Sequence, residues 1–358
     1  MPFRSSPAVR RLRRHALRQS LFAPVSLTAA IAKLGFVQAD PIRAPARAQD
    51  LILRHRVHDY RVGDLERQYA DLDVDEDLLY AYGFLSRPVG RWLHPRPAVS
   101  LTALEQRVYA TVRDRGPLHP AELEPQFGSR RVVNAWGGFS KATTHALERL
   151  HQRGLLRVAG RKNGIRIYEA RPASDACPTA ERWRQIILAV VKILSPVSLR
   201  CLRQALTPIR RLLPPAEPIT VLVRSLVLSG TLRQETVAGV VYLMDDCDSD
   251  GIDVTPVVRL LAPFDPVVWD RVRFEQFWGW AYRFEAYTPV AKRVRGYYAL
   301  PLLWADQVIG WANSAIVGGQ LDIQLGFVRS RPRSRQFRIE LERELARFET
   351  FLNLPAGI

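Results

Sequence analysis

The feature that most constrains the fold is a tight hairpin preceded by three helical segments. Two apolar runs, Leu155–Val158 and Ile165–Tyr168, flank Asn163-Gly164. Both central residues of a type I′ turn need a positive φ, which Asn-Gly tolerates well, so this dipeptide predicts a two-stranded wing. Three helices followed by such a wing predict a winged-helix module over residues 98–172.

The helices before this hairpin have recognisable ends. Ser100 is the expected N-cap of the first, and Arg115-Gly116-Pro117 should end it. The second is expected over residues 119–127. Ser140 is the expected N-cap of the third, and Gly154 its C-terminal stop.

A second unit with the same order of elements is predicted over residues 176–246. Pro178 begins a long helix with an apolar stripe, and Ser198 begins another. A third helix over 219–229 and a strand pair over 231–244 complete a winged helix.

A more divergent winged-helix unit is predicted over residues 1–97, because helices are expected near 8–19 and 26–34. Sequence identity between the three units is weak, so the repeat is architectural. After Gly251 the pattern changes to a C-terminal domain over 252–358.

Alternating apolar and aromatic runs in that last domain predict a small, twisted β-sheet or barrel followed by a closing helix. The expected strands and helix are Arg283–Tyr287, Tyr297–Trp304, Val308–Ser314, Gln320–Phe327 and Phe337–Leu352. The predicted fold class is therefore α+β, with tandem winged-helix modules followed by a C-terminal β-rich domain.

Charge indicates a polyanionic partner. The chain has 52 Lys and Arg against 35 Asp and Glu, a formal net charge of +17, which favours nucleic acid or an anionic membrane over small acidic substrates. No apolar run is long enough to span a membrane and no signal peptide is evident, so we expect a cytoplasmic, nucleoid-associated protein. Cys177, Cys201 and Cys247 are scattered without metal-ligand spacing and are expected to be buried free thiols.

The acidic segment before Gly251 partly matches the pattern of a calcium-binding loop. Asp246, Asp248 and Asp250 fit the first, third and fifth positions, but Val257 stands at the twelfth, where a bidentate Glu is needed. We expect no metal and no cofactor.

The strongest chemical signal is the triplet Gln38-Ala39-Asp40 within an arginine-rich stretch. Gln38 and Asp40 are two residues apart, so on an extended backbone both side chains could hydrogen-bond one water. The arginines that follow place this carboxylate where phosphates are expected; they are Arg43, Arg47, Arg54 and Arg56. A carboxylate and a water in a positive field suit hydrolysis on a polyanion.

Each of these residues also has a structural alternative. Asp40 before Pro41 could be a helix N-cap with Pro at N1, although Pro45 would interrupt that helix. Gln38 could simply bond the backbone. Arg47 could be tied to Asp50 or to a carbonyl rather than to phosphate.

Further cations are predicted to contact DNA. They lie on one face of the third helix of the 98–172 module, at its wing tip and in a basic loop near the C-terminus, and a solvated charged face is the alternative for each. They are Lys141, His145, Arg149, Arg161, Lys162, Lys292, Arg293 and Arg295.

Four segments carry a family resemblance: Val37–Ile42, Leu260–Arg271, Tyr282–Glu285 and Lys292–Pro301. They resemble the YcaQ-like, or AlkZ-like, tandem winged-helix DNA glycosylases. The resemblance implies hydrolysis of the N-glycosidic bond of alkylated purines, including those that crosslink two strands, by a Gln-x-Gln or Gln-x-Asp motif. Gln38 and Asp40 match the Gln-x-Asp form and would be the catalytic residues.

One departure affects the substrate. Family members associated with crosslink repair tend to carry Trp-Ala-His on a helix after the motif, whereas this chain reads Tyr80-Ala81-Tyr82. If that histidine acts on the lesion, the substrate or the activity differs here. Tyr82 would then be either a replacement polar contact or a core aromatic residue.

The resulting hypothesis is a monomeric, monofunctional glycosylase acting on damaged double-stranded DNA. Asp40 would stabilise the sugar cation and orient or deprotonate a water, and Gln38 would hold that water or the sugar. The alternative is a non-catalytic winged-helix DNA-binding protein, either a transcription regulator or a damage sensor. A regulator should prefer one operator sequence, whereas a repair protein should bind DNA broadly.

Overall fold

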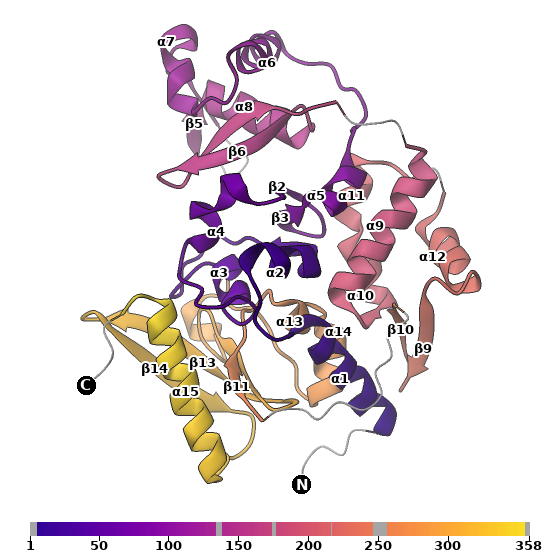
Figure 1. The fold of residues 1–358 in the computed structure, drawn as a ribbon, viewed down its shortest axis with the longest axis vertical. Helices are drawn as coiled ribbons and strands as arrows, with labels where there is room; N and C mark the ends of the chain where they lie inside the picture. The colour runs from indigo at the N-terminus through magenta and orange to yellow at the C-terminus, as the bar shows by residue number, and fades with distance from the viewer. Residues whose placement is uncertain (1–5, 134–137, 174–176, 216, 246–255, 355–358) are drawn as a thin grey trace.

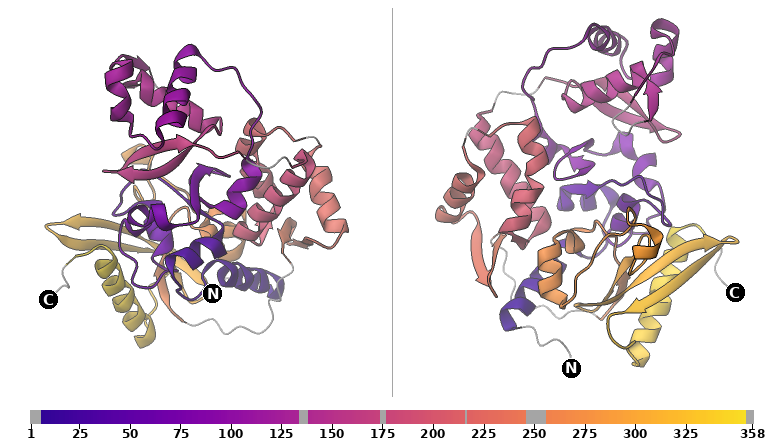
Figure 2. Two further views of the ribbon diagram at one scale, coloured as in Figure 1. Left: turned by 45° about the horizontal axis from the view of Figure 1, so that its top comes forward. Right: turned by 180° about the vertical axis from the view of Figure 1, so that it is seen from behind.

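A computed structural model describes residues 6–133, 138–173, 177–215, 217–245 and 256–354. The segments predicted from sequence occupy different regions of the molecule, with most of the first one central and its N-terminal helix at the lower edge (Figure 1). Seen from behind, the C-terminal sheet and its closing helix lie at the opposite end from the 98–172 segment (Figure 2). Cys247 and the rejected calcium-loop positions 246, 248 and 250 lie outside the described residues.

The first segment contains the two predicted helices, each capped by a serine. Ser6 accepts from the Val9 N–H and Ser26 from the Ala29 N–H, both at 3.3 Å. These helices are followed by a small antiparallel sheet of order β1-β3-β2. The elements are α1 (Pro7–Ser20), α2 (Leu27–Leu34), β1 (Phe36–Gln38), α3 (Ala48–Leu53), α4 (Asp64–Arg67), η1 (Tyr69–Asp71), β2 (Val74–Leu78), β3 (Tyr82–Ser86), α5 (Arg87–Gly90) and η2 (Arg91–Leu93).

The second segment has the predicted helices and hairpin. Asn163 and Gly164 have φ values of 53° and 77°, as a type I′ turn requires, so the predicted hairpin is confirmed. The elements are α6 (Ala103–Arg115), η3 (Pro120–Leu123), α7 (Glu124–Phe127), β4 (Arg131–Val133), β5 (Phe139–Lys141), α8 (Ala142–Gln152), β6 (Leu156–Lys162) and β7 (Ile165–Ala170).

Both predicted serine caps of the second segment are wrong. Thr102 caps α6 instead of Ser100, because Thr102 and Glu105 form a reciprocal capping box. Ser140 lies in β5, and Lys141 takes the N-cap position of α8 without a side-chain cap.

The third segment has its three predicted helices and strand pair. Ser198 caps α10 as predicted, accepting from the Cys201 N–H at 3.3 Å. Cys201 is buried, but Cys177 is only half-buried, so the expectation for that thiol is wrong. The elements are α9 (Thr179–Leu194), β8 (Val197–Ser198), α10 (Leu199–Ala205), α11 (Thr207–Leu212), α12 (Ile219–Leu228), β9 (Arg233–Val237) and β10 (Val240–Met244).

The last segment is an antiparallel four-stranded sheet of order β11-β12-β13-β14, with a long closing helix. The strand predicted at Arg283–Tyr287 is wrong, because these residues form a loop. The elements are β11 (Val258–Leu260), α13 (Pro266–Trp269), α14 (Arg271–Trp278), η4 (Val290–Lys292), β12 (Leu300–Trp304), β13 (Gln307–Val317), β14 (Gln320–Phe327) and α15 (Arg335–Phe351).

Three apolar cores join these segments. One core combines residues of the first, second and last segments, and another packs the first sheet against the helices of the third. In the remaining core, α1 packs with β10, α13 and α14. The mixed α and β architecture is as predicted. The division into four separate domains stays a prediction, because every core crosses at least one predicted boundary.

Candidate active site

Gln38 is the last residue of β1, where strand pairing places its side chain. It lies opposite Gly83 of β3, and the next N–H, of Ala39, donates to the Tyr82 carbonyl at 3.0 Å. The backbone thus stays extended beyond the strand. The side chain is 9% exposed, and its Oε1 accepts a hydrogen bond from the indole N–H of Trp269 at 3.2 Å. Because indole nitrogen only donates, the two amide N–H groups of Gln38 remain for other partners.

Asp40 lies in the loop after β1 and is half-buried. Its Oδ1 accepts from the Ile42 N–H at 2.9 Å. The N-cap alternative is wrong, because the next helix, α3, begins only at Ala48. Burial raises the pKa of Asp40, and the Ile42 hydrogen bond opposes that rise. A raised pKa makes the ionised carboxylate a stronger base, as proton abstraction from water requires.

Tyr298 is a further buried polar residue, although the sequence did not single it out as a site residue. The hydroxyl is buried and has no hydrogen-bond partner among the described residues. Burial raises the pKa of Tyr298, and the charge of Asp40 raises it further. The ring packs edge-on against Phe284, with centroids 5.3 Å apart. The resemblance covered Tyr298, but nothing in the local pattern distinguished it from other aromatic residues.

Two of the four motif arginines are structural, which corrects the expectation that they face phosphates. Arg56 is fully buried and forms two hydrogen bonds of 2.9 Å with the carboxylate of Asp265. Arg54 pairs with Glu344 at 2.5 Å and donates to the Leu260 carbonyl at 2.9 Å. Both arginines anchor the first segment to the last, and because their guanidiniums are already paired they are not presented to DNA phosphates.

The other two motif arginines differ from each other. Arg43 is exposed and forms no ion pair or hydrogen bond within the described part of the chain. Arg47 forms an ion pair with Glu66. The partner of Arg47 is thus Glu66 rather than the predicted Asp50 or a carbonyl. Arg47 also lies near the wing tip, since a Cβ on Gly164 would be 3.8 Å from its guanidinium.

The basic loop over residues 289–296 is held in a fixed shape. The carboxylate of Glu285 accepts three successive backbone N–H bonds, from Val294, Arg295 and Gly296, at 3.0, 2.8 and 3.2 Å. These three hydrogen bonds hold Glu285 against the loop, which explains why residues 283–287 do not form the predicted strand. The loop leads directly into Tyr298.

The three residues of this loop that were predicted to contact DNA differ in their exposure to solvent. Lys292 is exposed. Arg293 is half-buried and stacks on Tyr297, with 5.1 Å to the ring centroid. Arg295 is half-buried and stacks on Trp280, with 4.9 Å to the centroid. Only Lys292 is thus fully presented to solvent.

The predicted contacts on α8 are partly engaged within the protein. Lys141 pairs with Glu124, and Arg149 pairs with Glu105 at 2.9 Å. His145 is half-buried and lines a polar cavity of about 530 Å³ between the first and second segments.

At the wing, Lys162 is exposed, but Arg161 is bound to Glu76 through two hydrogen bonds of 2.7 Å. Glu76 is fully buried, which opposes ionisation, yet Arg161 and Arg166 hold its pKa below the ordinary value. Arg161 therefore attaches the wing to β2 and does not stand free at its tip.

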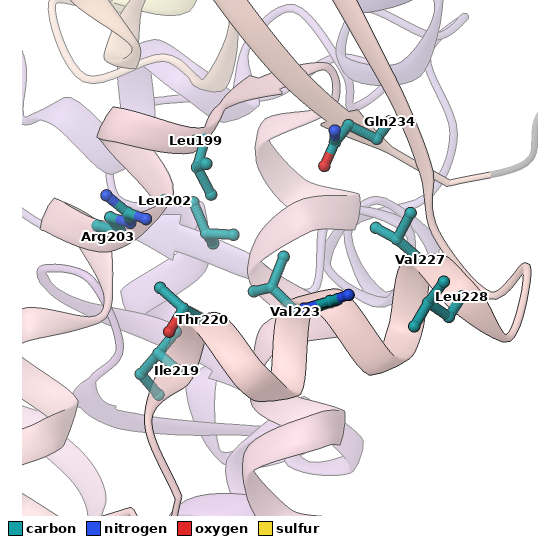
Figure 3. A pocket seen from close by; sticks show the side chains of 10 residues that line it. Leu199, Leu202, Arg203, Ile219, Thr220, Val223, Val227, Leu228 and Gln234 are labelled. Carbon is teal, nitrogen blue, oxygen red and sulfur yellow. The ribbon is translucent and has the colours of Figure 1, made fainter.

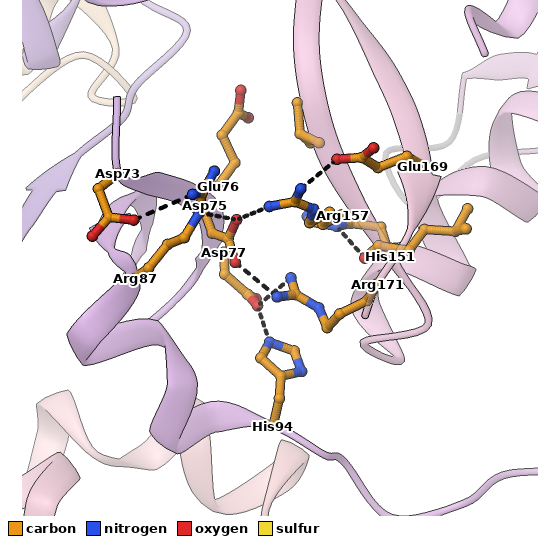
Figure 4. A network of polar contacts seen from close by, with 12 residues as sticks. Asp73, Asp75, Glu76, Asp77, Arg87, His94, His151, Arg157, Glu169 and Arg171 are labelled. Carbon is orange, nitrogen blue, oxygen red and sulfur yellow. Dashed lines mark hydrogen bonds and ion pairs between the residues drawn. The ribbon is translucent and has the colours of Figure 1, made fainter. Parts of the chain in front are cut away.

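Neighbouring acidic residues of β2 extend this attachment (Figure 4). Asp75 pairs with Arg171 of the second segment at 2.7 Å. Asp77 pairs with Arg96 at 2.6 Å and with His94 at 2.7 Å, both within the first segment. Through Glu76 and Asp75, β2 thus fixes the second segment against the first.

Tyr82, at the place of the missing histidine, makes polar contacts. Its hydroxyl donates to Glu76 at 2.9 Å and lies 3.4 Å from Nε2 of His151. It lies at the start of strand β3 rather than on a helix.

A second cavity, of about 370 Å³, lies between α10 and α12 in the third segment. Mainly apolar side chains line it, including Leu202, Val223 and Leu228 (Figure 3). Its polar neighbours are Arg203, Thr220, Arg224 and Gln234. With no carboxylate or histidine in this lining, the pocket offers no general base.

Two kinds of feature are absent from the described residues. Their histidine, cysteine and carboxylate side chains do not gather in groups of three or more suited to a metal ion. None of their helices combines the length and apolar character that a membrane crossing needs.

Comparisons with known proteins agree with this fold. A family model described as DNA glycosylase AlkZ-like matches residues 31–351. The structure is similar to that of Streptomyces sahachiroi DNA glycosylase AlkZ, with a TM-score of 0.62 and 16% sequence identity over 98% of this chain and 98% of that chain. At such low identity the structural likeness supports the fold. Since the family model spans most of the sequence, the chain belongs to the AlkZ-like DNA glycosylase family.

Proposed function

We propose that this protein is a monofunctional DNA glycosylase that hydrolyses the N-glycosidic bond of alkylated purines in double-stranded DNA, with N7-alkylguanine as the first substrate class. Interstrand crosslinks built from such adducts are the second. The observation that carries the proposal is a half-buried Asp40 with a raised pKa, two residues after the buried amide of Gln38.

The chemistry needs little beyond these two side chains. An N7-alkylguanine is cationic, so it leaves with the electron pair of the glycosidic bond and generates an oxocarbenium-like sugar. Asp40 stabilises that developing charge and takes a proton from the water whose oxygen bonds to C1′. Gln38 contributes N–H donors to the water or the sugar, because its oxygen is bound by Trp269. The products are the free base and an abasic site.

Exposed cations define the proposed DNA contacts. Arg43 follows the motif, Lys162 stands at the wing and Lys292 in the basic loop, all exposed to solvent. The remaining predicted contacts would have to exchange an internal partner for phosphate or are half-buried; they are Arg47, Lys141, His145, Arg149, Arg161, Arg293 and Arg295. We further propose that the protein works as a monomer, in the cytoplasm and close to the nucleoid.

The test is base release from duplex DNA that contains one N7-alkylguanine, followed by alkaline cleavage at abasic sites. Asp40→Asn should abolish release and leave DNA affinity nearly unchanged. Asp59→Asn is the matched control, because Asp59 is exposed and has a φ of 50°, which Asn tolerates.

Release that persists in Asp40→Asn would refute the catalytic assignment. Tight binding without release by the native protein would refute hydrolysis and favour a DNA-binding regulator or damage sensor. Binding that prefers one undamaged sequence would identify the regulator.

A further inference from the structure

Four large apolar side chains around the basic loop are exposed to solvent. The exposed fractions are 82% for Tyr287, 75% for Val290 and for Val294, and 44% for Tyr297. Single exposed apolar residues are ordinary, but a group of them on one short segment marks an interaction surface. We call these four residues the aromatic patch.

Contacts within the loop hold the two ends of the aromatic patch together. The carbonyl of Thr288, next to Tyr287, accepts a hydrogen bond of 2.8 Å from Nε of Arg293. The guanidinium of Arg293 also lies over the ring of Tyr297, 5.1 Å from its centroid. Arg293 thus joins the residue after Tyr287 to Tyr297, so both ends of the patch lie in one region of the surface.

The backbone beneath the aromatic patch has a fixed shape. Glu285 accepts hydrogen bonds from three successive N–H groups of the loop. Asn313 of β13 donates from Nδ2 to the Arg295 carbonyl at 2.6 Å. Gly296 has a φ of 124°, and a Cβ there would collide with the Asn313 amide, so the turn requires glycine. A loop that is already ordered loses little conformational entropy when it binds a partner.

The charge around the aromatic patch indicates the chemistry of its partner. Residues 287–297 contain three cations, Lys292, Arg293 and Arg295, and no Asp or Glu. Charged residues are depleted at the cores of protein–protein interfaces. Aromatic rings among cations are instead typical of surfaces that bind single-stranded nucleic acid, with bases stacked on the rings and phosphates near the cations. In a member of a DNA glycosylase family, these features favour DNA bases as the ligand.

We propose that the aromatic patch binds unpaired DNA bases, with Tyr287 and Tyr297 as the stacking surfaces. The inference rests on the proposed function for its ligand, DNA, and adds bases to the phosphate contacts proposed for the basic loop. Unpaired bases arise where a duplex opens or a nucleotide leaves the stack. Stacking on these rings requires no particular sequence, because every base has a π-face.

Packed rings connect the aromatic patch to the element that holds Gln38. Tyr287 packs against Phe284 with centroids 6.1 Å apart, and Phe284 packs against Phe264 with centroids 4.8 Å apart. Phe264 comes just before α13, whose last residue, Trp269, donates to Gln38. The patch and the Gln38 amide are therefore parts of one packed unit.

The test is the Kd for a single-stranded oligonucleotide and for a duplex with one unpaired 2-aminopurine. Tyr287→Ala removes an exposed ring, so thermal stability should be retained, and Kd for both DNAs should rise about 5- to 100-fold. Tyr287→Phe keeps the ring and should bind as the native protein does. The native protein should quench 2-aminopurine fluorescence by stacking, and Tyr287→Ala should quench it less.

Two controls separate stacking from charge and from a general change of surface. Leu228→Ala removes a similarly exposed side chain from α12, 77% exposed, and should leave Kd unchanged. Lys292→Ala should weaken binding and lower the salt dependence of log Kd by about one charge. Tyr287→Ala should weaken binding at an unchanged salt dependence, because it removes no charge.

The outcomes separate this inference from the proposed function. An unchanged Kd in both Tyr287→Ala and Tyr297→Ala would overturn the inference and leave a protein as the occupant of the patch. An equal loss in Tyr287→Phe or in Leu228→Ala would also overturn it, because neither removes a stacking ring. Base release judges the hydrolysis separately: if the native protein binds unpaired bases through Tyr287 but releases none, the inference stands and the proposed hydrolysis falls.

Discussion

Breaking the ion pair between Arg56 and Asp265 should destabilise the folded protein strongly. Both side chains are fully buried, they share two hydrogen bonds of 2.9 Å, and 209 positions separate them in the sequence. Asp265 also caps α13, accepting from the Val267 N–H at 3.0 Å. That short helix ends at Trp269, which binds Gln38.

The magnitude follows from these contacts. Asp265→Ala leaves the Arg56 guanidinium buried without its counter-charge, which costs about 3–5 kcal/mol, and removes a helix cap worth about 1 kcal/mol. We therefore expect the free energy of unfolding to fall by roughly 4–6 kcal/mol. Asp265→Asn keeps an oxygen for the cap but opposes an amide to the guanidinium, so its loss should be about 1 kcal/mol smaller.

Urea unfolding followed by tryptophan fluorescence measures both variants. Asp73→Asn is the control, because Asp73 pairs with Arg87 at the surface, where an ion pair contributes little. A loss below about 1 kcal/mol for Asp265→Ala would refute the reasoning, because it would mean that Arg56 finds water or another partner in the variant.

Two further predictions concern the motif. Trp269→Phe should slow single-turnover base release up to about tenfold at unchanged DNA affinity, because the Gln38 amide loses the bond that fixes its orientation; a native rate would contradict this. Burial raises the pKa of Asp40, so the folded state disfavours the ionised carboxylate. As pH rises through that pKa, the contribution of Asp40 to the free energy of unfolding is lost. Base release rises over the same range, because the ionised carboxylate is the form that accepts a proton. Thermal unfolding should therefore show Asp40→Asn to be more stable than the native protein at neutral pH, with the difference vanishing in acid; a less stable variant at neutral pH would refute the sign.

Elements with strong local signals could be predicted from the sequence. The Asn163-Gly164 turn was correct because its residues alone select the type I′ geometry. Ser198 was correct because capping involves only the next few residues. The prediction of Ser100 as a cap was wrong because Thr102 lies three residues before Glu105, the spacing of a capping box. That signal is local and is present in the sequence.

The arrangement of the candidate site could not be predicted, because its partners are remote in sequence. Trp269 is 231 positions from Gln38, and the sequence around either residue does not indicate their contact. Arg54 and Arg56 looked like phosphate ligands because neighbouring arginines read as a positive field. Their carboxylate partners come from the last segment, and only the fold reveals them.

The arginine excess therefore has two distinct roles. The buried Arg56 and the half-buried Arg161 join segments by pairing with carboxylates that would otherwise be costly to bury. Exposed cations such as Lys162 remain for a polyanion. Net charge indicates the class of partner but does not say which residues meet it. The candidate site follows the same logic: β1 supplies the Gln38 amide and the loop after it supplies the Asp40 carboxylate, while Trp269 of α13, from the last segment, holds the amide.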